Sequence, residues 1–130
     1  MAYYLDTSAL TKLVVAEPET TALRHWFSAH DRDPVSCDLA RTELLRAVRC
    51  NNPHHAVRAR EVLDTLTLVV VTTAIFEAAG RLDPAMLRTL DAVHLAAALD
   101  IGDELEAMVT YDDRLAEAAT ANGVAVVCPR

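Results

Sequence analysis

The stretch AYYLDTSALTKLV, residues 2–14, decides the fold of this chain. It begins with a short apolar segment, 2–5, which is typical of a buried β-strand. It then passes through a single acid, Asp6, into a segment whose apolar residues fall on one face of a helix. A strand that leads directly into a helix is the repeating unit of parallel α/β sheets, so this stretch predicts such a sheet.

The same alternation continues to the end of the chain. Apolar segments bounded by polar or turn residues predict five strands: Ala2–Leu5, Pro34–Ser36, Leu66–Val71, Ala107–Thr110 and Val124–Cys128. Helical patterns lie between them, at 10–14, 23–27, 39–49, 55–64, 74–81, 90–99 and 114–122. Strands that alternate with helices pair in parallel through right-handed crossovers. The sequence therefore predicts an α/β fold, a three-layer α/β/α sandwich with a central, mostly parallel sheet.

Length and composition indicate one ordinary globular domain over residues 1–130. The chain is 52% hydrophobic and 24% charged, and no run approaches the roughly 18 apolar residues that a membrane span needs. Asp6 comes too early for a signal peptide, so we expect a cytoplasmic protein with no membrane association. The cysteines are widely separated and are expected to be reduced thiols rather than zinc ligands: Cys37, Cys50 and Cys128.

Four acids are the candidate catalytic and metal-binding residues: Asp6, Glu43, Asp91 and Asp112. Three of them fall where a strand or loop passes into a helix, the edge at which open parallel sheets gather their sites. Two unit charges about 4 Å apart repel by roughly 4 kcal/mol at an effective dielectric of 20. A cluster of four carboxylates therefore implies a bound cation or raised pKa values, and a divalent metal is the simpler explanation.

Each acid also has a purely structural interpretation. Asp6 and Asp112 could cap the helices that follow them, and Asp91 could lie in a first turn capped by Thr89. Glu43 is harder to explain in this way, because it lies within the apolar stripe of its helix. An ionised side chain facing a core is costly unless it is paired or bound to a metal. If the fold brings the four acids together, independent capping becomes the weaker account.

The chemistry of these residues suits a metal-dependent hydrolase. Oxygen-only ligands select hard cations such as Mg²⁺, for which Mn²⁺ can substitute, and such an ion lowers the pKa of a bound water. Ser8 and Thr110 are auxiliary candidates, since each is two residues from an acid, Asp6 and Asp112, that its hydroxyl could orient. His94 lies one turn after Asp91, and we expect it to be a core histidine rather than a base.

The charge of the chain is distributed unevenly. The formal net charge of −7 argues against nucleic-acid binding over the whole surface. Residues 41–60, however, hold five arginines against a single acid, Glu43. This segment is either a solvated helical face or a surface that holds phosphates, for which arginine is well suited. If the second interpretation holds, Arg46 and Arg49 are the candidate RNA contacts.

Taken together, four segments resemble the PIN-domain ribonucleases, and among them the VapC-type toxins of toxin–antitoxin pairs. They are YLDTSAL (4–10), TEL (42–44), LDAVHLAAA (90–98) and VTYDDRL (109–115). None of these motifs is specific alone, but their order and spacing are. The resemblance covers nearly the whole chain, so residues 1–130 are expected to form a single PIN domain.

The resemblance implies a metal-dependent endoribonuclease, a homodimer and a small cognate VapB-type antitoxin that blocks the site. Asp6, Glu43, Asp91 and Asp112 match the acids of the family, while the adjacent Asp113 is an alternative to Asp112 as the inward ligand and otherwise an auxiliary acid. The substrate is expected to be RNA, cleaved through a metal-activated water.

Two other functions are also considered. The first is a PIN-like interaction module without activity. The second is a receiver-type Mg²⁺-binding phosphoacceptor domain, which needs an acidic pair after the first strand and a late lysine. Here the first strand ends in a lone acid, Asp6, and the only lysine is Lys12, so the receiver interpretation is disfavoured.

Overall fold

A parallel β-sheet forms the centre of the molecule. The computed structural model describes residues 1–50 and 52–130, and within these residues the sheet has five strands in the order β3-β2-β1-β4-β5, every neighbouring pair being parallel. The strands are β1 (Ala2–Leu5), β2 (Asp33–Cys37), β3 (Thr67–Val69), β4 (Leu105–Val109) and β5 (Val126–Val127).

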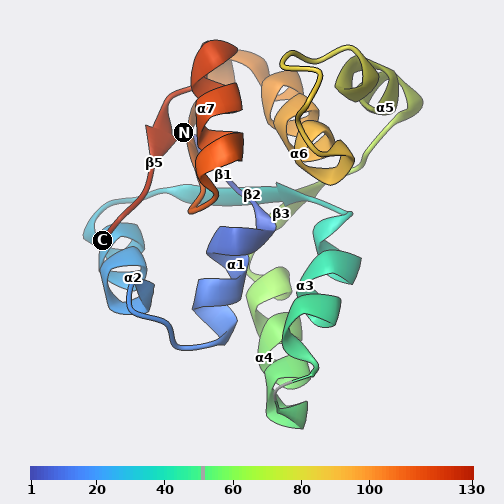
Figure 1. The fold of residues 1–130 in the computed structure, drawn as a ribbon. Helices are drawn as coiled ribbons and strands as arrows, with labels where there is room; N and C mark the ends of the chain where they lie inside the picture. Colours follow the sequence, from blue (N-terminus) through green and yellow to red (C-terminus); the bar gives the residue numbers. More distant parts are fainter. Residues whose placement is uncertain (51) are drawn as a thin grey trace.

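Helices cover both faces of this sheet, as Figure 1 shows. One layer contains α1 (Thr7–Val14), α2 (Thr20–Ala29), α3 (Ala40–Val48) and α4 (Pro53–Asp64). The other contains α5 (Thr73–Gly80), α6 (Thr89–Asp100) and α7 (Asp113–Ala121), and a 3₁₀ turn, η1 (Gly102–Glu104), precedes β4. The predicted three-layer α/β/α sandwich is confirmed, and over the described residues its sheet is wholly parallel.

Each face of the sheet has its own hydrophobic core, and neighbouring residues of β1 point into different ones. Tyr4 packs with residues of α5, α6 and α7, whereas Leu5 packs with residues of α1, α3 and α4. Both side chains are fully buried. A central strand of a parallel sheet is covered on both faces, which explains why 2–5 is a continuous apolar run rather than an alternating one.

The helix predicted to be central and packed on most sides is α6. Residues 92–98 are buried without interruption and contribute to the core between the sheet and the layer of α5, α6 and α7. The helix begins at Thr89, with Arg88 at the N-cap position and no side-chain capping bond. The predicted cap by Thr89 was therefore wrong.

Strand ends differ from the prediction mostly at the edges of the sheet. The third strand was predicted to run to Val71 but ends at Val69, because the Val71 amide donates to the Asp38 side chain at 3.2 Å instead of joining the ladder. Strand β5 is also shorter than predicted, and β4 begins two residues earlier, at Leu105.

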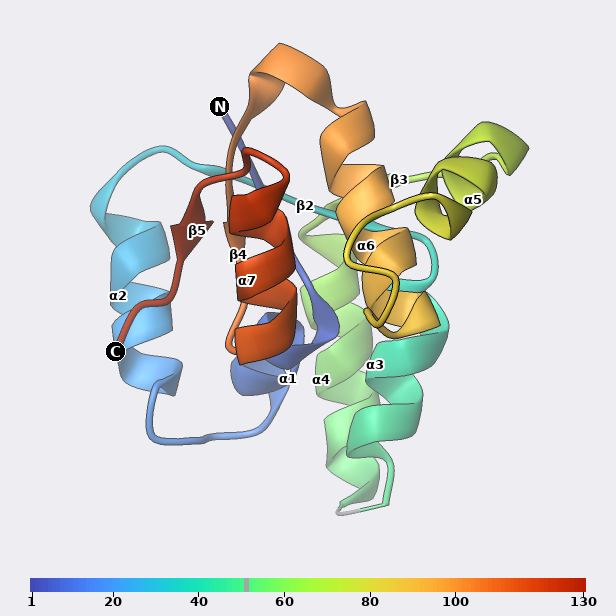
Figure 2. The ribbon, with the colours of Figure 1, turned by 45° about the horizontal axis from the view of Figure 1, so that its top comes forward.

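Helices α3 and α4 form a hairpin that projects away from the sheet (Figures 1 and 2). Asn52 caps α4 by accepting a bond from the His54 amide at 2.9 Å. Asn51, the residue before this cap, lies outside the described residues. Across the described part of the chain, no helix combines the length and the apolar character needed to cross a membrane.

The strand order fixes where a site can form. The chain places β2 and β3 on one side of β1, and β4 and β5 on the other. In open α/β sheets, ligands bind beyond the carboxyl ends of the strands where the order reverses in this way. Here that point lies at the ends of β1 and β4, directly before Asp6 and close to Asp112.

Candidate functional site

Asp6 follows β1 and is held from three directions. Its Oδ1 caps α1 by accepting the Ala9 amide at 3.0 Å, and it also accepts the Ser8 hydroxyl at 2.7 Å. Its Oδ2 accepts the Thr110 hydroxyl at 2.7 Å. These bonds fix the orientation of the carboxylate, so Ser8 acts on Asp6 as predicted. Thr110, predicted to orient the Asp112 carboxylate, accepts the Asp112 backbone amide at 3.1 Å and donates its hydroxyl to the Asp6 carboxylate.

Burial dominates the electrostatics of Asp6. The residue is only 3% exposed, and this desolvation raises its pKa despite the opposing donors Ser8, Thr110 and Ala9. A raised pKa means that the negative charge is costly where it lies. A cation near this carboxylate would recover that cost.

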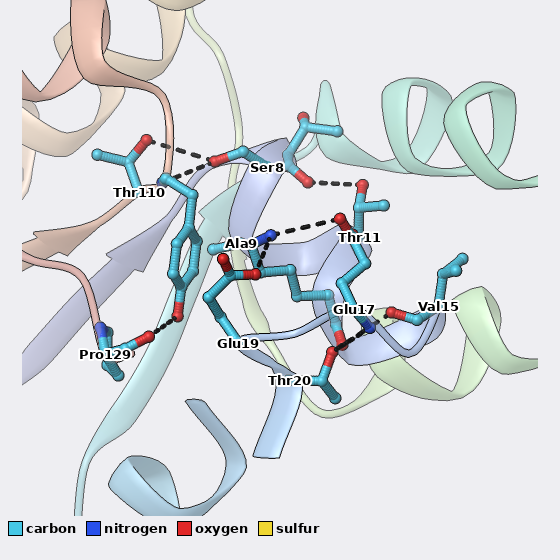
Figure 3. Close-up of polar contacts among 12 residues, drawn as sticks. Ser8, Ala9, Thr11, Val15, Glu17, Glu19, Thr20, Thr110 and Pro129 are labelled. Carbon is cyan, nitrogen blue, oxygen red and sulfur yellow. Dashed lines mark hydrogen bonds and ion pairs between the residues drawn. The ribbon is translucent and has the colours of Figure 1, made fainter. Parts of the chain in front are cut away.

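Behind Ser8, a second layer of contacts holds the Tyr111 backbone. The Tyr111 amide donates to the Ser8 oxygen at 2.9 Å, and the Tyr111 hydroxyl donates to the Pro129 carbonyl at 2.7 Å. Figure 3 shows this region, with the Ser8 hydroxyl facing that of Thr110. The ammonium of Lys12 lies 4.6 Å from the centre of the Tyr111 ring, a cation–π contact. Ser8 is thus held through Tyr111, whose side chain contacts Lys12 and Pro129.

Asp112 follows β4 and caps α7. Its Oδ1 accepts the amides of Arg114 and Leu115 at 2.9 and 3.1 Å, and its Oδ2 accepts a bond from Arg88 at 2.8 Å. The neighbouring Asp113 is exposed and does not line the pocket to which Asp112 contributes. Of the two acids between which the sequence did not decide, Asp112 is therefore the inward one.

Glu43 on α3 is paired rather than isolated in its apolar stripe. Its Oε1 accepts the Thr7 hydroxyl at 3.0 Å and lies 2.5 Å from Nε2 of His94. Nδ1 of His94 lies 2.7 Å from the Tyr4 hydroxyl. His94 is 2% exposed, so it is a core histidine as predicted, but one that also holds a site carboxylate.

The Glu43–His94 contact shifts both titrations toward the charged forms. Partial burial tends to raise the pKa of Glu43, but His94 and the Thr7 hydroxyl outweigh it and lower that pKa. Burial likewise tends to lower the pKa of His94, but its contacts with Cys37 and Glu43 raise it overall. Glu43 is thereby held as a carboxylate at neutral pH.

Asp91 lies in the first turn of α6, where its negative charge suits the helix dipole. Its Oδ2 accepts a bond from Nε of Arg88 at 3.1 Å. Arg88 therefore bridges two of the predicted acids, Asp91 and Asp112, which belong to different helices.

The four predicted acids meet in one pocket of about 410 Å³. Its lining comprises Asp6, Thr7, Ser8, Glu43, Arg88, Thr89, Leu90, Asp91, His94 and Asp112. The acids reach it from four elements far apart in the sequence: the end of β1, α3, α6 and the start of α7. Independent capping accounts for the backbone bonds of Asp6 and Asp112, but not for this convergence.

Comparison with known proteins agrees with this arrangement. The family described as PIN domain matches residues 3–121. The chain belongs to the PIN-domain family. Ribonuclease VapC47 of Mycobacterium tuberculosis (strain CDC 1551 / Oshkosh) is 45% identical to it over 130 residues, covering 97% of this chain and 96% of that protein. The similarity therefore extends to the VapC ribonucleases within the family.

Solved structures show the same fold at lower identity. The crystal structure of Mycobacterium tuberculosis VapC20, described as a Sarcin-Ricin loop cleaving toxin, matches with a TM-score of 0.77 at 18% identity, covering 98% of this chain and 99% of that one. A toxin–antitoxin complex from Klebsiella pneumoniae matches with a TM-score of 0.71 at 21% identity, covering 98% of each chain. These likenesses support the PIN fold.

Three residues of this PIN-domain site were not predicted to have a role there: Thr7, Arg88 and the Glu43-binding His94. A weak signal existed for two of them. Thr7 lies between two predicted site residues, Asp6 and Ser8, and Arg88 precedes Asp91 by one helical turn. Neither spacing reveals a contact with a side chain on another element, which only the fold provides.

The donor set of this PIN domain suits a hard divalent cation. Its four acids offer only oxygen ligands, and Glu43 Oε2 and Asp91 Oδ1 accept no hydrogen bond within the described residues. A cationic group, the Arg88 guanidinium, already lies between two of the acids. Over the same residues, however, no three acidic, histidine or cysteine side chains are grouped as ligands of one ion. The donor chemistry fits a metal, but these side chains would have to move for three of them to reach one ion.

Proposed function

We propose that this PIN domain is a Mg²⁺-dependent endoribonuclease, with Mn²⁺ able to substitute, and the toxin of a toxin–antitoxin pair. One observation carries the proposal: Asp6, Glu43, Asp91 and Asp112 converge on a single pocket from four separate elements. The 45% identity to a protein named a ribonuclease supports it.

The four acids are the residues that would hold the cation. A divalent metal bound there would supply Lewis-acid chemistry, neutralising charge on the phosphate and lowering the pKa of water. The residues around the acids fix the orientation of these carboxylates. Ser8 and Thr110 hold Asp6 in one orientation, which is what a precise site for phosphodiester hydrolysis requires.

Glu43 has a distinct part in this proposal. Its contacts with Thr7 and His94 keep it ionised. Both contacts use Oε1, so Oε2 accepts no hydrogen bond among the described residues. Because His94 is buried and bonded on both ring nitrogens, it is a positioning residue for Glu43 rather than a base that reaches the substrate.

The products of the reaction provide the decisive experiment. Purified protein without antitoxin should cleave total RNA when Mg²⁺ or Mn²⁺ is present and stop in excess chelator. Hydrolysis in which water attacks phosphorus leaves 5′-phosphate and 3′-hydroxyl ends, whereas attack by the 2′-hydroxyl leaves a 2′,3′-cyclic phosphate. Mapping of the new ends separates the two. Cyclic-phosphate ends, or full activity in chelator, would contradict the proposed chemistry.

No cleavage of any RNA under these conditions would favour the second function, a PIN-like interaction module without activity. The retention of all four acids in one pocket is the observation against it.

Two exposed arginines at the C-terminal end of α3 are the proposed RNA contacts. Arg46 and Arg49 follow Glu43 by one and two turns, both are exposed, and neither forms an ion pair among the described residues. They lie on the projecting α3–α4 hairpin, whose α3 also carries Glu43 (Figure 2). A polyanion lying along α3 would thus lead into the pocket.

Replacing Arg46 and Arg49 together with alanine should weaken RNA binding and flatten its salt dependence. Each phosphate contact to a single strand contributes about 0.7 to the slope of log K against log salt, so the slope should fall by up to roughly 1.4. Fluorescence anisotropy at several salt concentrations measures it. The matched control replaces two exposed arginines elsewhere, Arg24 and Arg81. If the slope of log K against log salt is the same in both double variants, Arg46 and Arg49 belong to a solvated helical face and do not contact RNA.

The proposed partner is a cognate VapB-type antitoxin, and the proposed assembly is a homodimer. A neighbour with the same fold was solved as a toxin–antitoxin complex, which supports the first. Co-expression with a candidate VapB-type antitoxin, followed by co-purification, tests the antitoxin, and light scattering of the purified chain tests the dimer.

A further inference from the structure

Arg88 connects two helices of the site through two carboxylates. It immediately precedes α6 in extended backbone, with φ −61° and ψ 147°. Its Nε donates to Asp91 Oδ2 at 3.1 Å, and its Nη2 donates to Asp112 Oδ2 at 2.8 Å. The guanidinium therefore bonds to half of the acids in the pocket while lining that pocket itself.

These bonds leave Asp112 without an uncommitted oxygen. Its Oδ1 caps α7 by accepting two backbone amides, and its Oδ2 accepts Arg88. The capping bonds are part of the fold, whereas the arginine bond is a side-chain contact at the surface. A cation that binds to Asp112 must therefore compete with Arg88 rather than with the helix.

Displacing Arg88 costs little. Its side chain is 64% exposed, and solvent screens ion pairs at the surface, so they contribute little to stability. Once released, the guanidinium remains at the mouth of the pocket on an extended backbone. Its planar set of donors matches the oxygens of a phosphate.

The geometry points to Arg88 as an exchangeable counter-ion of the site. Arg88 would compete with a divalent cation for Oδ2 of Asp91 and Oδ2 of Asp112, and its guanidinium, once displaced from these oxygens, would be available to a phosphate of the RNA. This inference rests on the proposed function and adds to it a residue that would make metal binding and RNA binding mutually supportive.

The test uses isothermal titration of the full chain with Mn²⁺ alone, without RNA. Replacing Arg88 with glutamine removes the competitor, so the variant should bind Mn²⁺ roughly three- to tenfold more tightly than the unaltered chain. Arg88→Lys keeps the charge but lacks the planar fork that bridges both carboxylates, so it should fall between the two. Arg81→Gln is the matched control, because it removes the same charge from an exposed residue without an ion pair among those described.

A second measurement separates this role from a merely structural one. In cleavage of a short single-stranded RNA, Arg88→Gln should raise KM several-fold with a smaller change in kcat. Tighter metal binding together with weaker RNA binding is the expected pair of opposite shifts. A structural residue would weaken both.

The outcomes distinguish this inference from the proposed function. Equal Mn²⁺ affinity in Arg88→Gln and Arg81→Gln, with binding by the unaltered chain, would overturn the exchange alone. Weaker Mn²⁺ binding by Arg88→Gln would also overturn it. No Mn²⁺ binding by any of these proteins would overturn both proposals, whereas binding only by Arg88→Gln would support the exchange in its strongest form.

Discussion

Replacing Asp6 with asparagine should reduce RNA cleavage by at least about a hundredfold and leave the fold intact. The amide keeps the shape of the side chain and can still accept the Ala9 amide that caps α1. It loses the charge that would hold a cation, and such electrostatic contributions are worth several kcal/mol, where roughly 2.7 kcal/mol corresponds to a hundredfold in rate. Single-turnover cleavage of a defined RNA measures the loss.

Stability provides an independent check on the same variant. Burial raises the pKa of Asp6, so the folded state binds the proton more tightly than the unfolded state. The resulting destabilisation is absent below the unfolded pKa of 3.8 and fully present above the folded pKa. In chelator at pH 7, Asp6→Asn should therefore melt at a higher temperature than the unaltered chain, and this difference should vanish near pH 3.

Asp113→Asn is the control for both measurements. It makes the same change of charge at an exposed residue that does not line the pocket. We expect near-normal cleavage and no rise in melting temperature at pH 7. Full activity of Asp6→Asn, or loss of activity in Asp113→Asn, would refute the assignment of the inward acids.

Addition of Mn²⁺ or Mg²⁺ should raise the melting temperature substantially. A ligand that binds only the folded state stabilises it by about 2.7 kcal/mol at 100 times its Kd. For 130 residues this corresponds to roughly 10 °C. Differential scanning fluorimetry with and without chelator measures the shift, and Asp91→Asn should remove most of it.

Asp91 and Asp6 should behave differently when no metal is added. Repulsion within the acidic cluster alone predicts that Asp91→Asn is stabilising, but Asp91 is paired with Arg88. Because the arginine of this pair is largely exposed to solvent, loss of the pair should lower the metal-free melting temperature only slightly. A melting temperature that is indifferent to millimolar Mn²⁺ would argue against a metal site altogether.

The sequence predicts the layers of this fold well because hydrophobic periodicity, capping residues and turn residues are local features of the chain. Segment 2–14 contains a strand, a cap and a helix in consecutive residues, and all three form as expected. The ends of β3 are less predictable, since the bond of Val71 to Asp38 depends on a residue 33 positions away. Edge strands also lack a second neighbour to define where they stop.

The site follows the same rule: features within one segment could be predicted, and contacts between distant segments could not. The four acids could be identified because each stands out in its own segment, Glu43 most clearly as a charge in an apolar stripe. What surrounds them could not be predicted in this way. The contacts of His94 with Glu43 and of Arg88 with Asp112 span 51 and 24 residues, and they depend on how α3, α6 and α7 meet. The bond from Thr110 to Asp6, which spans 104 residues, was missed for the same reason.

Lys12 gives this protein a built-in chemical probe. It is the only lysine in the sequence, it is 8% exposed, and its ammonium lies against Tyr111 with Glu19 2.9 Å away. Burial tends to lower its pKa, but Glu19 and Glu17 raise it overall, so the reactive neutral amine is scarce while the contacts hold. An amine-directed reagent can therefore acylate Lys12 only when the contacts of its ammonium with Tyr111 and Glu19 open. The rate at which the Lys12 adduct appears in a peptide map, where it is separate from the adduct of the exposed N-terminal amine, would time that opening without any engineered label.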